Sequence, residues 1–279
     1  MAGTGSMLRR YAGDFRVLIP GTSAGMMQLL YPPLGAGVGE HSDFFHDPFG
    51  RIYRSIPQIW ATIFEPDAAA RAVRVRDLHT GIKGGEGAGR YHALDPETFW
   101  WAHATFTWEV FRSVELFHPE TLTAEEEERL YADTVQWYER YGMSMRPVPA
   151  DYTAFRAKFH RICVEDLALN PVAERALDIA LNGRGVSVLP GAPAPVGRLA
   201  SLVAEPSARS SAFGCLPEIV RERFGIPWGP RDQIVFAMRR QTIRQGWEAV
   251  PERVNRAALR SVLRYIGSAT REQRYRPAA

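Results

Sequence analysis

Pairs in which an Asp or Asn is followed directly by proline constrain this sequence more than any other feature. They occur at Asp47-Pro48, Asp95-Pro96 and Asn170-Pro171. The first residue of each pair can cap a helix with its side chain, and proline is favoured at the first helical position, where its missing N–H costs nothing. No strand-like alternation of apolar and polar residues persists anywhere in the chain. The sequence therefore predicts an all-α protein of about ten helices.

The other helix boundaries follow from similar signals. Thr123 and Glu126 have the spacing of a capping box, and the small residues from Leu34 to Gly39 form a helix only if they pack closely. We expect helices over residues 24–31, 48–64, 68–82, 96–117, 124–141, 151–169, 171–181, 213–224, 230–247 and 251–266.

These helices are expected to form a single domain over residues 21–267. An irregular segment at 1–20 precedes it, and its first six residues resemble the remnant of an expression tag. A polar tail at 268–279 follows. Inside the domain, the longest predicted loop covers residues 184–197 and leads to a short apolar segment at 198–203.

The composition argues against several classes of protein. With 46% hydrophobic and 23% charged residues, the 279-residue chain has the balance of an ordinary soluble globular protein. No apolar run is long enough to span a membrane, and the N-terminus lacks the pattern of a signal peptide. Cys163 and Cys215 suit a reducing compartment, so we expect a cytoplasmic protein. A net charge of +3 does not indicate nucleic-acid binding, although arginine is concentrated in residues 221–279.

The usual motifs of hydrolases and kinases are missing. The glycine-rich run at residues 84–89 follows a predicted helix, which is the wrong context for a phosphate-binding or dinucleotide-binding loop. Neither a Cys-x-x-Cys pair nor a His-Glu-x-x-His helix is present. Histidine is the remaining source of chemistry, and five of the seven histidines lie between His41 and His103.

Two of these histidines are candidates for a cofactor ligand. His79 is predicted in the latter half of its helix, four residues after Val75 and on the inward face. One inward histidine in an aromatic-rich, all-α protein is sufficient to hold haem, but a hydrogen-bonded core histidine explains the same pattern, and the residues alone favour that explanation. His103 is flanked by Trp100 and Phe106 and has the same two interpretations.

Arg51, Arg54 and Ser55 lie on one face of the helix predicted to begin at Pro48. Two guanidiniums beside a hydroxyl suit a carboxylate, a propionate or a bound oxygen species. The alternative is a solvated basic face. His41 and His46 precede this helix with irregular spacing, which makes them a weak metal pair.

Several motifs, taken in order, resemble one known family. It contains the fungal mycophenolic-acid pathway oxygenase and the bacterial latex-clearing rubber oxygenase. The resemblance covers most of the chain and includes a C-terminal segment at residues 216–228. The motifs that carry it are Glu40-His41-Ser42, Asp47-Pro48, Arg51-x-x-Arg54-Ser55, Val73-Arg74-Val75-Arg76-x-x-His79, Tyr91-x-Ala93-x-Asp95-Pro96 and Trp101-Ala102-His103-Ala104-Thr105.

The resemblance implies an all-α fold with a globin-like core, and a haem b whose iron is bound by one proximal histidine. His79 matches that ligand best, with His103 as the alternative, and Trp100 and Phe106 are expected beside the cofactor. The family's distal Arg-x-x-Lys-Thr motif matches residues 51–55 here, but Arg54 replaces the lysine. Because a guanidinium does not readily ligate iron, we expect the sixth position to be open or held by water or another side chain.

Two functions of different classes follow from this resemblance. The first is a haem-dependent oxygenase or oxidase that uses dioxygen on an apolar small molecule, with oxidative C=C cleavage as one reaction of the family. Arg51, Arg54 and Ser55 would then be catalytic and would stabilise negative charge that develops on dioxygen. The second is a non-catalytic protein that binds haem or a lipid. We expect no nucleic acid and no membrane insertion, and the oligomeric state, a homodimer included, is left open.

Overall fold

The computed structural model describes residues 5–182 and 209–274; the side chains of Arg51 and of residues 268–274 are among those it leaves out. The prediction of an all-α protein is confirmed. The elements are α1 (Met7–Ala12), η1 (Phe15–Leu18), α2 (Gly21–Leu30), α3 (Pro32–His41), α4 (Pro48–Phe64), α5 (Ala68–Asp77), β1 (Lys83–Gly84), η2 (Gly87–Gly89), β2 (Tyr91–His92), α6 (Pro96–Phe117), α7 (Ala124–Glu139), α8 (Tyr152–Glu165), α9 (Pro171–Asn182), α11 (Glu218–Arg223), α12 (Pro230–Glu248) and α13 (Glu252–Arg274).

The helix starts predicted from Asp47-Pro48, Asp95-Pro96, Asn170-Pro171 and Thr123 are confirmed in atomic detail, whereas the helices expected from residues 24 and 213 begin at Gly21 and Glu218. Asp47 accepts a hydrogen bond from the Gly50 N–H at 2.8 Å, and Asp95 caps α6 through the N–H groups of Glu97 and Thr98. Asn170 caps α9 in the same way, and the capping box at the start of α7 is present. These local hydrogen bonds satisfy the first N–H groups of each helix, which have no partner within the helix itself.

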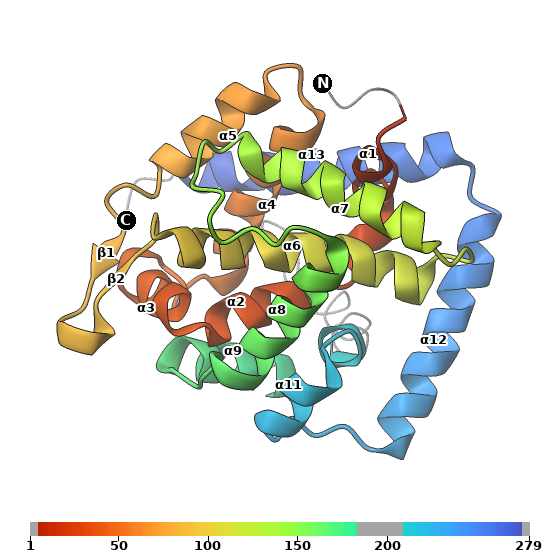
Figure 1. Ribbon diagram of the computed structural model, residues 1–279. Helices are drawn as coiled ribbons and strands as arrows, with labels where there is room; N and C mark the ends of the chain where they lie inside the picture. The colour runs from red at the N-terminus through yellow and green to blue at the C-terminus, as the bar shows by residue number, and fades with distance from the viewer. Residues whose placement is uncertain (1–4, 183–208, 275–279) are drawn as a thin grey trace.

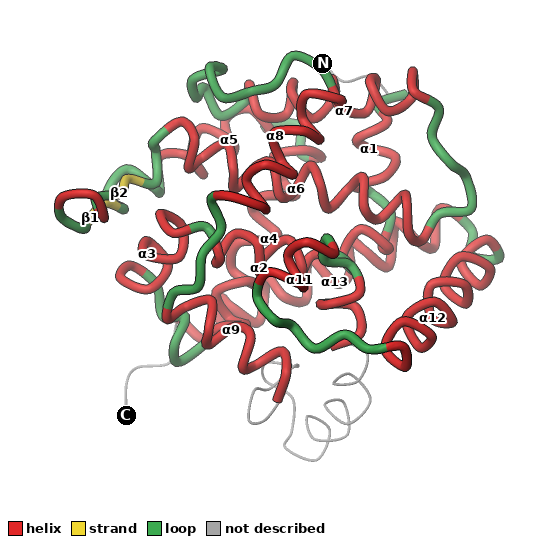
Figure 2. Tube along the Cα trace, turned by 60° about the horizontal axis from the view of Figure 1, so that its bottom comes forward, coloured by secondary structure: helices red, strands yellow, loops and turns green. Residues whose placement is uncertain are grey.

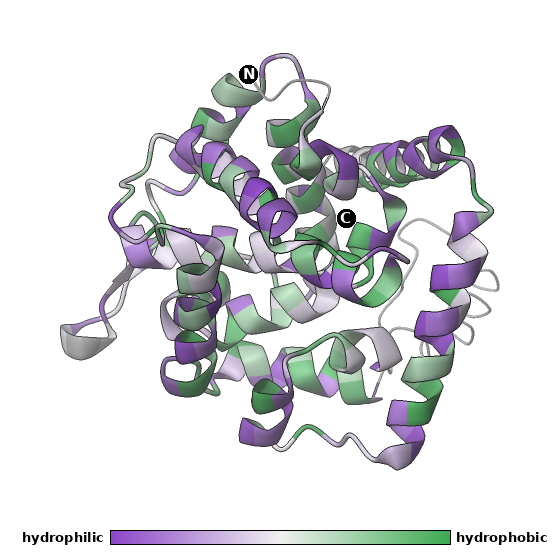
Figure 3. Ribbon diagram, turned by 45° about the vertical axis from the view of Figure 1, so that its right-hand side comes forward, coloured by the Kyte–Doolittle hydropathy of each residue, from purple (hydrophilic) through white to green (hydrophobic). Residues whose placement is uncertain are grey.

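Helix α6 lies at the centre, and other helices surround it (Figure 1). It contacts η1, α1, α2, α3, α7 and α12. Figure 2 shows the same arrangement from another side, with α12 set apart at the edge of the molecule. In Figure 3, α12 carries hydrophilic and hydrophobic residues in alternation along its length.

Three fully buried tryptophans join the helices around this centre. The indole N–H of Trp101 donates to the Met27 carbonyl, that of Trp60 to the Ala12 carbonyl, and that of Trp137 to the Thr62 hydroxyl. Each indole therefore buries a large apolar surface while its only polar atom keeps a partner. Trp101 thus joins α6 to α2, Trp60 joins α4 to α1, and Trp137 joins α7 to α4.

Some predicted boundaries were wrong. The N-terminal segment, expected to be irregular, forms α1 and η1, because Leu8, Tyr11 and Val17 are buried in the core. Helix α13 continues to Arg274 instead of ending at residue 266, so part of the expected polar tail is helical. The predicted loop at 184–197 and the segment at 198–203 lie outside the described residues.

The glycine-rich parts also differ from expectation. Helix α3 does form over the run of small residues, since Gly35 lies against Asn170, where a Cβ would come within 2.6 Å of its Nδ2 atom. The stretch after α5 contains a two-stranded antiparallel hairpin, in which Lys83 pairs with His92. None of the helices in the described part of the chain is long and apolar enough to cross a membrane.

Candidate functional site

His79 lies in the turn after α5, not in the latter half of a helix as predicted. The helix ends at Asp77, because the Thr80 hydroxyl donates to the Asp77 carbonyl and the chain then turns into the hairpin. The backbone N–H of His79 still bonds the Arg76 carbonyl, so the turn continues directly from the helix. The imidazole is held close to the last turn of α5 rather than projecting from its middle.

The ring of His79 has a defined orientation. Its Nδ1 atom lies 2.7 Å from the Val75 carbonyl oxygen, which can only accept, so Nδ1 carries the proton and Nε2 is the basic nitrogen. The ring forms an edge-to-face contact with Phe99 on α6, with centroids 6.2 Å apart and an interplanar angle of 86°. A backbone carbonyl bound to the other ring nitrogen is the usual device that orients a histidine for metal binding.

One face of α6 continues from this contact. Ala102 and Phe106, three and seven residues after Phe99, keep part of their surface accessible although most of the helix is buried. The Phe106 ring packs against Trp60 of α4, with centroids 6.1 Å apart. This face of α6 therefore reaches from His79, at the end of α5, to α4. Its apolar side chains keep some accessible surface between these two helices.

On α4, the structure places Arg54 beside the start of its own helix. Its Nη1 atom lies 3.4 Å from the Asp47 carboxylate, which also caps α4, and the Arg54 side chain is 28% exposed. Ser55 is half-buried on the same helix, as are the nearby Ile56 and Ile59. The side chain of Arg51 lies outside the described residues, so its place on this face remains a prediction from helical spacing.

His103 lies in a different environment, against α7. Its Nε2–H donates to the Thr134 carbonyl at 3.1 Å, and the ring is enclosed by Trp137, Tyr138 and Tyr141 at centroid distances of 4.6, 5.1 and 6.0 Å. Burial lowers the pKa of His103 to about 3, so the imidazole is neutral. Its Nδ1 atom is buried without a hydrogen-bond partner among the described residues.

Trp100 points to yet another side of α6. Its ring packs against Phe155 of α8, and the Lys158 ammonium lies 4.0 Å from the ring centroid. The structure thus brings Phe106 towards α4 and directs Trp100 towards α8, whereas His79 meets α6 through Phe99. The predicted site residues on α6 do not share one face.

The remaining histidines and cysteines do not form a multi-ligand metal centre. His41 lies near the Lys83 carbonyl, His46 pairs with Asp43, and His92 lies near the Thr80 carbonyl. In residues 5–182 and 209–274, no three His, Cys, Asp or Glu side chains gather closely enough to hold a metal ion. Burial raises the pKa of both cysteine thiols to about 12, which makes them poor nucleophiles.

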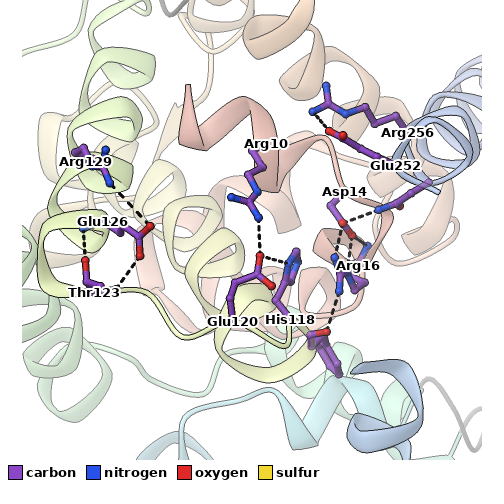
Figure 4. A network of polar contacts seen from close by, with 12 residues as sticks. Arg10, Asp14, Arg16, His118, Glu120, Thr123, Glu126, Arg129, Glu252 and Arg256 are labelled. Carbon is purple, nitrogen blue, oxygen red and sulfur yellow. Dashed lines mark hydrogen bonds and ion pairs between the residues drawn. The ribbon is translucent and has the colours of Figure 1, made fainter. Parts of the chain in front are cut away.

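A charged cavity of about 310 Å³ lies at the opposite end of α6 from Asp95 (Figure 4). Arg16 and Asp14 form a buried ion pair at 2.7 Å, and Asn255 of α13 donates to Asp14. Burial alone would raise the pKa of Asp14, but the hydrogen bonds from Arg16 lower it. His118 lines the same cavity, and burial lowers its pKa to about 4. These paired charges join α13 to the N-terminal segment, and neither His79 nor Arg54 lines the cavity.

Two polar residues of α6 were missed from the sequence. Glu109 and Ser113 are buried, at 1% and 0% exposure, and the described residues offer no hydrogen-bond partner to Glu109 Oε2 or Ser113 Oγ. A signal was available, because Glu109 is the single acid between Glu97 and Glu115 in a helix that is otherwise largely apolar there. Burial raises the pKa of Glu109 well above its ordinary value.

Comparison with known proteins gives one match. A family model described as "ER-bound oxygenase mpaB/B'/Rubber oxygenase, catalytic domain" matches residues 9–245, which is most of the chain. No curated protein matches the sequence. No solved structure matches it either.

Proposed function

This chain belongs to the family of ER-bound oxygenases mpaB/B′ and rubber oxygenases, and on that premise we propose that it is a haem b-dependent oxygenase. It would use dioxygen to oxidise an apolar small molecule, and oxidative cleavage of a C=C bond is the reaction to test first. The observation that carries the proposal is the hydrogen bond from His79 Nδ1 to the Val75 carbonyl, which makes Nε2 the basic nitrogen.

The residues present fit a haem with one protein ligand. His79 would bind the iron through Nε2, and the Val75 carbonyl would hold the ring in position. Phe99, Ala102 and Phe106 offer an apolar surface beside it for the macrocycle. When bound, haem would supply the activation of dioxygen, which no side chain of this protein can provide alone.

The protein's own contribution is binding, orientation and the exclusion of water. Arg54 supplies the N–H donors of its guanidinium and Ser55 supplies a hydroxyl, so α4 offers hydrogen-bond donors to a propionate or to dioxygen. Asp47 holds the Arg54 guanidinium at 3.4 Å and limits where it can reach. Phe106 and Trp60 close the space between α4 and α6 with aromatic surface, which would keep water from an apolar substrate.

The first experiment is an absorption spectrum of the purified protein, with haemin added if the protein is colourless. A sharp Soret band at one haem per chain is the expected result. A protein that remains colourless and does not bind haemin would contradict the cofactor assignment.

The second experiment measures dioxygen uptake by the haem-loaded protein. Squalene, which has isolated C=C bonds, should support uptake, and squalane, its saturated counterpart, should not. Haem binding without uptake on squalene or on other apolar alkenes would favour the second function, a non-catalytic haem-binding protein.

A further inference from the structure

Glu109 and Ser113 form a polar pair on the central helix. They are one helical turn apart on α6, and both are almost completely buried. Glu109 Oε2 and Ser113 Oγ have no hydrogen-bond partner in the part of the chain that the structure describes. Buried polar atoms nearly always have partners, so two orphans on adjacent turns of one helix require an explanation.

The pair lies on the α6 face that reaches from His79 to α4. Residues 102, 106, 109 and 113 follow one another at spacings of four, three and four, which places them along one side of a helix. Ala102 and Phe106 are the partly accessible residues of that side, and the two orphaned groups follow them. The polar pair is therefore buried on the same side of the helix as the surface on which the proposed function places its ligand.

The start of helix α2 is one neighbour of Glu109. A Cβ at Gly21, the first residue of α2, would lie 3.0 Å from Glu109 Oε1, so the carboxyl group lies against the start of that helix. No side chain among the described residues caps α2, and the N–H groups of a first turn have no partner inside the helix. Burial raises the pKa of Glu109 well above its ordinary value, which favours the protonated carboxyl, and that form donates a hydrogen bond.

We propose that Glu109 and Ser113 bind a carbonyl oxygen of the ligand that lies along this face of α6. The substrate of the proposed oxygenase is then an apolar molecule that carries a carbonyl group, and this inference rests on the proposed function for the position of the substrate. A carbonyl oxygen accepts two hydrogen bonds and donates none, which matches two hydroxyl donors one turn apart. A pure hydrocarbon such as squalene offers no acceptor to these two groups, so it can serve as a test substrate for dioxygen uptake but should bind more weakly than a ketone.

The test compares binding of decan-2-one and decane to the purified protein by intrinsic tryptophan fluorescence. The wild-type protein should bind the ketone more tightly than the hydrocarbon. Glu109→Leu should lower the affinity for decan-2-one by about fivefold, the value of one neutral hydrogen bond. Its affinity for decane should not change. Glu109→Gln still donates through its amide and should retain the preference for the ketone.

Thermal unfolding separates a binding role from a structural one. Because Glu109 Oε2 has no hydrogen-bond partner among the described residues, replacing Glu109 with leucine should leave the melting temperature unchanged or higher. Glu97→Gln is the matched control, since Glu97 is on the same helix but pairs with Lys158 of α8. It should alter neither ketone nor decane binding.

Three outcomes would overturn the inference. The Glu109→Leu protein could keep the preference for the ketone, or it could melt at a lower temperature or fail to fold. The wild-type protein could also prefer decan-1-amine over decan-2-one. The last would mean that the carboxylate is ionised and forms an ion pair. The binding assay requires neither haem nor turnover. Ketone binding without dioxygen uptake would therefore contradict only the proposed function. Dioxygen uptake that Glu109→Leu leaves unchanged on a ketone substrate would contradict only this inference.

Discussion

His79 and His103 come from the same histidine-rich stretch, and each has one ring nitrogen bonded to a backbone carbonyl. They differ in what surrounds the rest of the ring. His79 is half-buried in the turn after α5, where it contacts Phe99 of α6. His103 is enclosed by three aromatic rings that belong to α7 and the residues after it. A haem ligand must face a space as wide as the macrocycle, and the enclosure of His103 is filled by side chains. The comparison therefore favours His79 over His103 as the ligand of the proposed haem.

The largest expected effect comes from replacing each of the two histidines, in separate variants, with an apolar residue. His79→Ala should lose the Soret band of the haem-loaded protein, because the only proposed axial bond is removed. His103→Leu should keep the band at full intensity after allowance for any loss of folded protein, which circular dichroism would measure. The opposite pattern, with the band lost only in His103→Leu, would reverse the assignment.

Acid should destabilise the protein through His103. An unfolded histidine has a pKa near its ordinary value of 6.5, whereas that of folded His103 is about 3. As the pH falls below 6.5, the unfolded chain binds a proton that the folded chain does not, so the free energy of unfolding falls. The expected loss is about 2 kcal/mol between pH 6.5 and 5. The pKa of folded His118 is also lowered, to about 4, so His118 increases this loss of stability in acid.

Urea denaturation at pH 7 and pH 5 measures this loss. His103→Leu should lose less stability on acidification than the wild type, since one of the two buried imidazoles is gone. Glu109 acts in the opposite direction, because its folded pKa is raised and its contribution to stability is lost as the pH rises. Both proteins contain Glu109, so its effect cancels in the comparison. Equal losses in the two proteins would show that His103 is protonated in the folded state.

The sequence predicted what local hydrogen bonds determine. Helices α4 and α6 have the predicted bounds, because Asp47-Pro48 and Asp95-Pro96 satisfy the first N–H groups without help from the rest of the fold. Helix α1 was missed, since six residues form a helix only when tertiary packing buries them.

The site was predicted less completely, because side-chain directions depend on neighbours distant in sequence. Trp100 was expected beside the cofactor but packs on α8, and Arg54 pairs with Asp47. That Glu109 Oε2 has no partner among residues 5–182 and 209–274 cannot be known until the neighbouring elements are in place. The position of His79 differed from the prediction only because α5 ends at Asp77, two residues before it.

A moderate effect is expected from Arg54, on the α4 side of the proposed site. Arg54→Gln should lower the rate of dioxygen uptake by about tenfold or more, since a charged donor is replaced by a neutral one. Haem content should not change. The pair with Asp47 is partly exposed and is worth at most about 1 kcal/mol, so stability should change little. Arg71→Gln is the control, because Arg71 pairs with Asp67 on the exposed side of α5. A similar loss of rate in both variants would mean that Arg54 has no specific role.

The smallest expected effects come from Asp47, which both caps α4 and holds Arg54. Asp47→Ala should cost about 1 kcal/mol of stability, because the Gly50 N–H loses its acceptor. Asp47→Asn keeps an acceptor for that N–H but removes the charge beside Arg54, so it should cost no more than about 0.5 kcal/mol. Urea denaturation at pH 7 measures both values. An equal loss of stability in Asp47→Asn and Asp47→Ala would show that the ion pair, and not the cap, holds the start of α4. Arg54 would then be a structural residue of α4, unlike His79.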